Sequence, residues 1–262
     1  MAREIKRILI STMPRSGTVY FFNFMSMLYG FEKVEPLFTG GMPVPPEWDP
    51  YKFDETYLSL KSGQVLCAHY PLTEKLAAVT RAEDLLCIYL FRDPRDAAVS
   101  AALYIRNALT HHPLHDFFQR ISEADSIMFI LTGGIVRNGD TYIVHEGMRY
   151  FCRMAREWLA QDHVVAIRYE EFMADPVATL VAGLGKADVV IDPQAIRKVA
   201  EQLTFSGLSG GRVPGQEQKS SHFRKGITGD YVNYFSETHK AICKLMIGDF
   251  LIEQGYESGH LW

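Results

Sequence analysis

The sequence predicts an α/β fold in a single domain over residues 1–262, with a parallel β-sheet of four or five strands and helices on both faces. Two observations lead to this prediction. Short apolar segments of strand length alternate along the chain with longer segments of helical spacing, which is the pattern of a parallel sheet. In addition, Leu85–Phe91 is apolar almost throughout, as expected of a central strand that is buried on both faces.

The predicted strands and helices follow one another along the chain. Strands are predicted at residues 5–10, 64–70, 85–91 and 163–169. Helices are predicted at residues 20–30, 72–82, 94–104, 148–159, from 175 onwards, at 193–202 and at 236–254. Irregular structure is predicted for the proline-rich and aromatic segment 31–60, for much of 105–145 and for the glycine-rich segment 206–229.

The composition limits the class of protein. A hydrophobic fraction of 47% is ample for a packed core, and no apolar run is long enough to predict a membrane span. The first four residues lead directly into the first strand, so no signal peptide is expected, and the predicted location is cytoplasmic. The four cysteines lie far apart and are interpreted as reduced thiols. A net charge of −4 argues against broad nucleic-acid binding.

The segment 11–20 joins the first strand to the first helix, and the rest of the chain is organised around it. The first turn of a helix has unpartnered amide groups and partial positive charge, so an anion fits there. Gly17 lets the backbone approach that anion, Arg15 adds a full charge, and Ser16 and Thr18 add hydroxyl donors. The segment lacks the first glycine and the lysine of the usual ATP loop, which favours a shorter phosphate chain.

Ligands of parallel sheets bind at the carboxyl ends of the strands. Four polar residues are predicted to gather at this edge, because each follows or ends a strand: Arg15, His69, Arg92 and Tyr169. A histidine at such an edge is a sensible base for a hydroxyl nucleophile, since it titrates near neutral pH.

Two further segments could hold a second phosphate. Arg92 leaves a buried strand and Ser100 lies on the following helix, whereas Arg95 and Asp96 are expected to form surface ion pairs. Arg224 and Lys225, next to Gly226, form a plausible phosphate clamp in a loop.

Together these segments resemble the soluble sulfotransferases that use 3′-phosphoadenosine 5′-phosphosulfate (PAPS), and the bacterial members in particular. That family has P-K-S-G-T-x-W, T-H at a strand end, R-x-P-x-D-x-x-x-S, Y-E-D and R-K-G-x-x-G-D-W. In this chain the corresponding segments occur in the same order, at residues 14–20, 68–69, 92–100, 169–171 and 224–231.

The resemblance implies a P-loop-like phosphosulfate-binding loop and a role for each matching residue. The 5′-phosphosulfate would be held by Arg15, Ser16, Gly17 and Thr18, with Val19 in the same loop. The 3′-phosphate would be held by Arg92, Ser100, Arg224, Lys225 and Gly226. The adenine would pack on Tyr20, Tyr169 and Phe205. His69 matches the catalytic base, and Arg15 would stabilise charge on the bridging phosphate oxygen.

The expected reaction is in-line transfer of a sulfuryl group from PAPS to a hydroxyl or amine, with 3′,5′-diphosphoadenosine (PAP) as product and no metal. The acceptor is expected to be a small apolar molecule. The segments left to bind it are 36–58 and 104–150, which are largely apolar and contain no run of Lys or Arg. Their aromatic and aliphatic residues are Phe38, Trp48, Tyr51 and Phe53 in the first segment and Ile127, Met128, Phe129, Ile130, Leu131 and Tyr142 in the second. The acceptor's identity and the oligomeric state stay open.

Other functions also stay open at this point. Leu90-Phe91-Arg92-Asp93 could be a strand ending in the magnesium-binding aspartate of a P-loop kinase, and the chain could also be a nucleotide-binding module without activity. His111, His112 and His115 could suggest a metal, but Pro113 interrupts them and no acidic or cysteine partner is near in sequence.

Overall fold

The computed structural model of the chain describes residues 3–34 and 59–262. Contacts divide these residues into two compact units. We call the first the sheet unit, with described residues 3–34, 59–92 and 154–207, and the second the helical unit, with residues 93–153 and 208–262. The single domain over residues 1–262 therefore stays a prediction.

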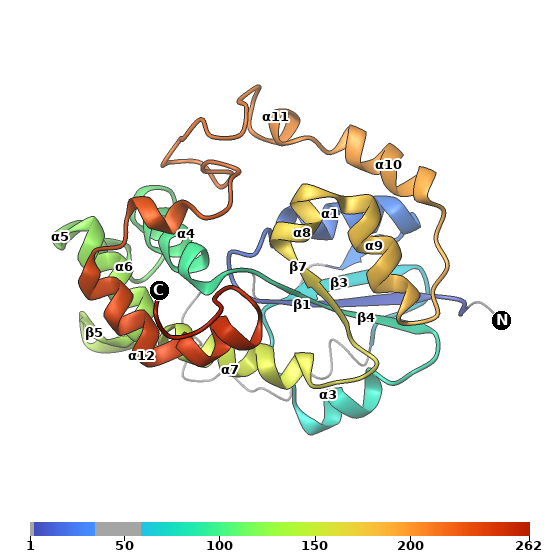
Figure 1. The fold of residues 1–262 in the computed structure, drawn as a ribbon, viewed down its shortest axis with the longest axis horizontal. Coiled ribbons are helices and arrows are strands. Elements are labelled where there is room, and N and C mark those ends of the chain that lie inside the picture. Colours follow the sequence, from blue (N-terminus) through green and yellow to red (C-terminus); the bar gives the residue numbers. More distant parts are fainter. Residues whose placement is uncertain (1–2, 35–58) are drawn as a thin grey trace. The chain divides into compact units, whose positions relative to one another are not determined.

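The sheet unit contains a five-stranded sheet in which every neighbouring pair is parallel. Its strands are β1 (Arg7–Thr12), β2 (Glu32–Val34), β3 (Gln64–Ala68), β4 (Leu85–Phe91) and β7 (Val165–Arg168). Their order across the sheet is β2-β3-β1-β4-β7, so β1 lies at the centre (Figure 1). The predicted α/β fold with a parallel sheet is confirmed.

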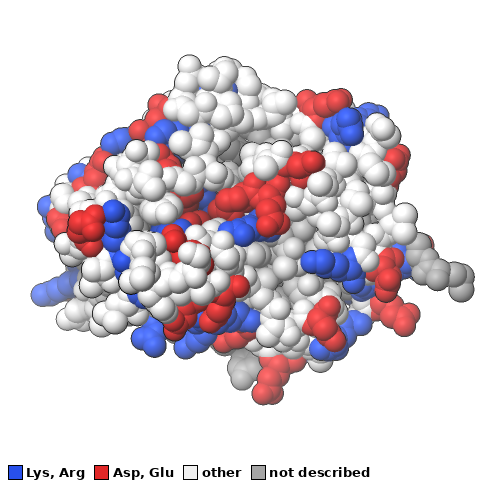
Figure 2. Space-filling model, in the orientation of Figure 1, with Lys and Arg blue, Asp and Glu red and all other residues white. Residues whose placement is uncertain are grey.

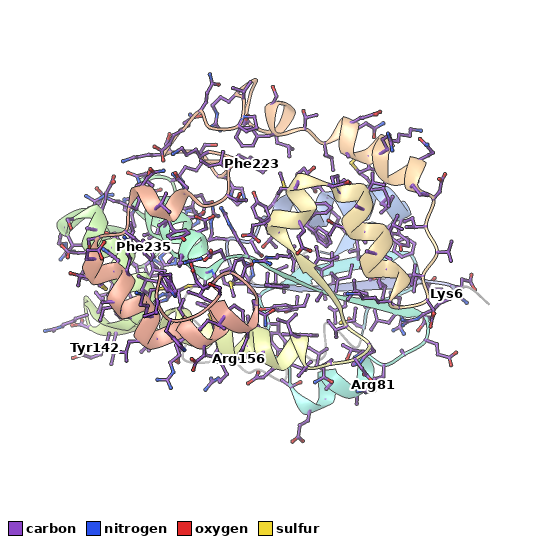
Figure 3. All side chains as sticks on the ribbon, viewed as in Figure 1. Lys6, Arg81, Tyr142, Arg156, Phe223 and Phe235 are labelled. Carbon is purple, nitrogen blue, oxygen red and sulfur yellow. The ribbon has the colours of Figure 1, made fainter. Side chains whose placement is uncertain are left out.

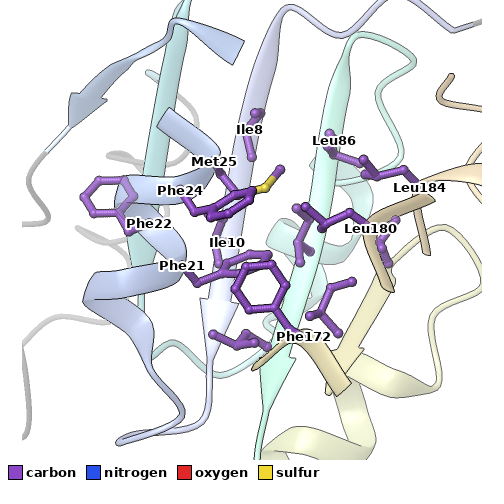
Figure 4. Close-up of a cluster of buried hydrophobic side chains, with 14 of the residues drawn as sticks. Ile8, Ile10, Phe21, Phe22, Phe24, Met25, Leu86, Phe172, Leu180 and Leu184 are labelled. Carbon is purple, nitrogen blue, oxygen red and sulfur yellow. The ribbon is translucent and has the colours of Figure 1, made fainter. Parts of the chain in front are cut away.

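One face of this sheet is covered by α1 (Thr18–Tyr29), α8 (Tyr169–Ala174), α9 (Pro176–Gly185) and α10 (Pro193–Gln202) (Figure 1). Alternate residues of β4 point to this side, and Leu86, Ile88 and Leu90 join the hydrophobic cluster drawn in Figure 4. In that cluster the Phe172 ring meets the rings of Phe21 and Phe24 edge to face, at 5.0 and 5.1 Å. Burial of such a side chain contributes about 1.5–3 kcal/mol, so Phe172→Ala would loosen α8.

The opposite face is covered by α3 (Glu74–Val79) and by the last residues of α7 (Gly147–Leu159). The Trp158 indole stacks on the Tyr89 ring of β4 with centroids 5.9 Å apart, and its Nε1 donates to the Tyr70 carbonyl at 2.8 Å. Both faces of β4 are thus buried, which explains its unbroken apolar sequence.

The helical unit is built from α4 (Pro94–Asn107), α5 (His115–Arg120), α6 (Glu123–Thr132), η1 (Asp230–Asn233) and α12 (Glu237–Glu253). Side chains cap its longer helices: Asp93 caps α4, Ser122 caps α6, and Ser236 forms a capping box with His239 on α12. Across its described residues and those of the sheet unit, no helix is long and apolar enough to cross a membrane.

Segments expected to be irregular contain further elements. These elements are β2 in the sheet unit and α5 and α6 in the helical unit. The helical unit also holds an antiparallel hairpin of β5 (Gly134–Asn138) and β6 (Thr141–His145), and Tyr142 on it is exposed (Figure 3). The β-branched residues of these strands flank Asn138-Gly139, which is a hairpin signal that could have predicted it. The short helix α11 (Phe205–Leu208) begins the segment that was expected to be a glycine-rich loop.

Candidate active site

The junction between β1 and α1 has a specific backbone shape. Arg15 and Gly17 both adopt left-handed conformations, with φ of 65° and 82°. Such a conformation is uncommon for a residue with a side chain, and it costs of order 1 kcal/mol. Gly17 is the N-cap residue of α1 and provides no side-chain cap, so the first amides of α1 remain available to a ligand.

Ser16 is used inside this loop. Its hydroxyl is fully buried and donates to the carbonyls of Met13 at 2.6 Å and Leu90 at 3.3 Å. Of the two hydroxyls predicted to contact an anion, the one from Thr18 is therefore the one that is partly exposed. The Ser16 bonds hold the loop against β4, and the assignment of Ser16 to the 5′-phosphosulfate stays a prediction.

Tyr169 and Arg92 pack beneath the loop. A Cβ atom on Gly17 would lie only 2.5 Å from Cε2 of the Tyr169 ring, so no other residue fits at this position without moving that ring. The Arg92 guanidinium lies 4.6 Å from the centre of the same ring, and its Nη1 donates to the Arg15 carbonyl at 3.3 Å. Arg92 follows β4 directly and is buried. These contacts hold a second cation next to the loop.

His69 lies at the end of β3 and contacts the end of β1. Its Nδ1 is 2.7 Å from the Thr12 hydroxyl oxygen and 3.0 Å from the Thr12 carbonyl oxygen. The Thr12 hydroxyl is in turn 3.0 Å from the hydroxyl of Thr18, the first residue of α1. The parallel pairing of β1 with β3, in which Ser11 lies opposite Ala68, brings His69 beside Thr12.

The His69 ring is neutral at physiological pH. Burial lowers its pKa to about 4, the hydrogen bond to the Thr12 carbonyl opposes this shift, and the charge of Arg15 adds to it. A neutral imidazole can accept a proton from a nearby hydroxyl, so the ring has the protonation state that a general base requires.

The sheet unit thus brings together most of the predicted site. Arg15 to Tyr20, His69, Arg92 and Tyr169 all lie at the carboxyl edge of its sheet. Tyr20 packs against the rings of Phe24 and Phe172 at 6.2 and 5.8 Å, and burial together with Tyr169 raises the pKa of its hydroxyl. Phe205 is the partly exposed first residue of α11 in the same unit.

The remaining predicted residues lie in the helical unit. Arg224 donates to Asp230 at 2.6 Å and also pairs with Glu217, while Lys225 donates to the second oxygen of Asp230 at 2.7 Å. Although burial opposes it, these two cations lower the pKa of Asp230. Gly226, with φ of 64°, completes the turn. Ser100 is buried on α4.

Arg95 and Asp96 correct an expectation, since both are 2% exposed rather than surface residues. The Asp96 carboxylate accepts from the backbone amides of Gly229 at 2.7 Å and Tyr231 at 2.9 Å, so it anchors the loop that carries Arg224. The position of Asp96 in the R-x-P-x-D pattern was the available sequence signal for this role.

Arg95 forms a second buried group around the start of α4. Its side chain makes three hydrogen bonds to Asp93, from 2.7 to 3.1 Å, and pairs with Glu257. Its guanidinium carbon lies 4.1 Å from the centre of the Tyr231 ring and 4.8 Å from that of the Trp262 ring. Because Asp93 also caps α4, its carboxylate is fully engaged, which argues against its use as a magnesium ligand in a kinase.

The expected acceptor residues fall into three groups. Those in the first segment, Phe38, Trp48, Tyr51 and Phe53, lie outside the described residues. Ile127, Ile130 and Leu131 are buried in the core of the helical unit. Met128 and Phe129 are partly exposed, and Tyr142 is exposed on the hairpin. Among the described residues, no group of three or more His, Cys, Asp or Glu side chains could hold a metal ion.

Comparison with known families gives one match. A family model described as a sulfotransferase domain matches residues 6–249, which extends across both compact units. No curated protein matches the chain.

Solved structures show a related fold. Mouse sulfotransferase SULT7A1 complexed with PAP has a TM-score of 0.65 and 19% identity, over 94% of this chain and 84% of that one. Retinol dehydratase with androsterone and inactive cofactor PAP has a TM-score of 0.61 and 14% identity, over 94% and 80% of the chains. Retinol dehydratase with retinol and PAP has a TM-score of 0.61 and 15% identity, over 95% of this chain and 82% of that one. At these identities the likeness establishes the fold.

Proposed function

Because the chain belongs to the sulfotransferase domain family, we propose that it transfers the sulfuryl group of PAPS to a hydroxyl of a small apolar acceptor. The observation that carries the proposal is the position of His69. Its Nδ1 is fixed by Thr12 beside the anion-binding loop, and among the described residues its Nε2 has no hydrogen-bond partner.

The loop suits the phosphosulfate end of PAPS because the groups around it are donors. The first amides of α1, the Thr18 hydroxyl, and the guanidinium groups of Arg15 and Arg92 all favour an anion. The left-handed backbone at Arg15 sets the local shape of the loop. The assignment of Arg92, Ser100, Arg224, Lys225 and Gly226 to the 3′-phosphate, and of Tyr20, Tyr169 and Phe205 to the adenine, remains a prediction from the family pattern.

PAPS supplies the sulfuryl group, and the chain supplies a base and cations. The acceptor oxygen forms a bond to sulfur while the bond from sulfur to the bridging phosphate oxygen breaks. His69 Nε2 takes the proton that the acceptor hydroxyl loses. Arg15 and the loop amides stabilise the negative charge that develops on the phosphate oxygen.

The proposed acceptor is compact and apolar. The segments 36–58 and 104–150 are rich in aromatic and aliphatic residues, and an anionic glycan would need a basic groove instead. Charges of both signs are interspersed over the face of the molecule in Figure 2. The androsterone and retinol bound to retinol dehydratase are molecules of the proposed kind. A cytoplasmic location and activity without a metal are part of the same proposal.

The test offers radiolabelled PAPS with two acceptor panels, one of hydrophobic alcohols and phenols and one of heparan-type glycans, in the presence of EDTA. Transfer to the first panel is expected, with a loss of about 10²–10⁴ in turnover for His69→Ala and unchanged PAP binding. PAP should bind about a hundredfold more tightly than AMP, because charge-assisted hydrogen bonds contribute roughly 1.5–3 kcal/mol each.

Each part of the proposal has its own contrary outcome. Transfer confined to glycans would refute the acceptor class. Activity lost with EDTA and restored by magnesium would refute the metal-free mechanism. Binding of PAPS without transfer to any acceptor would identify a nucleotide-binding module.

A further inference from the structure

Thr12 connects the predicted base to the anion-binding loop through its side chain. Its hydroxyl oxygen lies 2.7 Å from Nδ1 of His69 and 3.0 Å from the hydroxyl oxygen of Thr18. Thr12 is fully buried at the end of β1, and the matching family segment begins two residues later, at Pro14. No role was assigned to it by the sequence motifs.

The direction of these hydrogen bonds can be worked out from the acceptors. Nδ1 of His69 is also 3.0 Å from the Thr12 carbonyl, and a carbonyl oxygen can only accept. Nδ1 therefore carries the proton. The Thr12 hydroxyl oxygen, which Nδ1 also contacts, then accepts from it as well. The Thr12 hydroxyl proton then points to Thr18, whose own proton is left for the loop.

We propose that Thr12 is a positioning residue that holds His69 in the tautomer with its proton on Nδ1, and that an anion bound in the loop reinforces this tautomer through Thr18. This inference rests on the proposed function of His69 as a base. In the other tautomer Nε2 carries the proton and cannot accept one, so the Thr12 hydroxyl, acting together with the Thr12 carbonyl, favours the tautomer in which the ring can act as a base.

An anion bound in the loop is the final acceptor of this chain of hydroxyls. With an anion in the loop, the Thr18 hydroxyl donates to it, Thr12 donates to Thr18, and His69 donates to Thr12. Without an anion, the two hydroxyls can reverse, and a Thr12 hydroxyl that donates towards Nδ1 then opposes the Thr12 carbonyl and raises the share of the tautomer with its proton on Nε2. Binding of the PAPS anion in the loop is thereby coupled, within the sheet unit, to the tautomer in which His69 can act as a base.

The test removes the hydroxyl and keeps the volume. Thr12→Val is expected to lower kcat about 10–100-fold, to leave the affinity for PAP within about twofold, and to be rescued by Thr12→Ser. The matched control is Ser11→Ala, which removes the neighbouring buried hydroxyl that donates to the Tyr70 carbonyl at 3.1 Å, and which should leave kcat unchanged. A structural role alone would reduce stability in both variants without this difference in kcat.

The tautomer is read directly from the imidazole ¹⁵N shifts of His69, assigned with His69→Asn. We expect the proton on Nδ1 in the wild-type protein with PAP, and a larger share on Nε2 in Thr12→Val.

A kcat equal to that of the wild type in Thr12→Val, or a proton on Nε2 in the PAP complex, would overturn the inference. The NMR result also stands if Thr12→Val fails to fold, since the wild-type spectrum alone can contradict it. By contrast, absence of sulfuryl transfer by the wild type would refute the proposed function, whichever tautomer is seen.

Discussion

The protonation of His69 is set by its surroundings and not by the ordinary behaviour of histidine. A free imidazole would be half charged at pH 6.5, whereas burial and Arg15 lower the pKa of this ring to about 4 against the pull of the Thr12 carbonyl. The base is therefore already neutral across the physiological range.

This gives a prediction for the pH dependence of turnover. The active form is the neutral ring, so kcat should stay level from pH 8 down to pH 5 and fall only towards pH 4. Steady-state kinetics over that range, with stability checked at each pH, measures it. An acid limb with an apparent pKa near 6.5 would mean that His69 is exposed in the working enzyme or is not the base.

Gly17 gives a second prediction at the residue scale. Gly17→Ala should lower the affinity for PAP at least tenfold, because the new Cβ would lie 2.5 Å from Tyr169 and displace the ring that also contacts Arg92. The control is Gly30→Ala, which has a similar left-handed φ of 66° but no atom within 4 Å of its Cβ. Calorimetry and melting temperatures separate the two effects. Equal PAP affinities in both variants would contradict the role of the contact.

Single residues also show where sequence reasoning ends. The loop residues Arg15 to Thr18 were predictable because a strand, a glycine and a helix start stand next to each other in the chain. Thr12 was not, because its contact with His69 spans 57 residues and depends on the register of β1 with β3. Asp96 anchors a loop that lies 133 residues away, and local charge patterning suggested a surface pair instead.

At the scale of elements, the long loop before η1 is ordered by its own side chains. Arg212 donates to the carbonyls of Ser209, Gln216 and Arg224, at 2.8 to 3.1 Å, and to that of Phe223 at 2.5 Å. The glycines of this segment predicted a loop but not its shape. A single arginine satisfies several carbonyls at once, and nothing in the local sequence marks it out.

Glu217 in this loop pairs with Arg224, the residue predicted to bind the 3′-phosphate, and would compete with that phosphate for it. Burial opposes its charge, but Arg224 and Tyr234 hold the pKa of Glu217 below its ordinary value, so a carboxylate pairs with Arg224 in this structure. If Arg224 binds the 3′-phosphate, Glu217→Gln should tighten PAP binding several-fold, because one competing charge is removed. AMP, which lacks that phosphate, is the control ligand and should bind unchanged. Calorimetry showing the same small change for both nucleotides would leave Arg224 with a structural role only.

At the scale of the whole molecule, the sequence predicted the sheet better than its surroundings. Four strands and seven helices of the prediction are present within a few residues, because apolar periodicity is strong there. The edge strand β2 has only three residues and is too short for a periodic signal. The division into two compact units was not foreseen, since the chain crosses between them at residues 92–93, 153–154 and 207–208 without a linker composition.

Each compact unit contains a histidine that is neutral when folded. His69 in the sheet unit and His145 in the helical unit both have their pKa lowered to about 4, by burial in each case. The unfolded chain binds protons on both histidines near pH 6.5, so between pH 6.5 and 4 the unfolded state holds more protons than the folded one. The stability due to the neutral rings is therefore complete above pH 6.5 and is lost as the pH falls towards 4.

We accordingly expect the urea midpoint of unfolding to fall between pH 7.5 and pH 5. The fall should be smaller in His69→Asn and in His145→Asn, because each variant removes one group that takes up a proton on unfolding. His111→Asn, at an exposed position, serves as the control and should follow the wild type. Unfolding curves at the two pH values, with the m-value compared to check the transition, measure the effect. An equal fall in all four proteins would show that other groups cause the acid sensitivity and that these two rings are not held neutral by the fold.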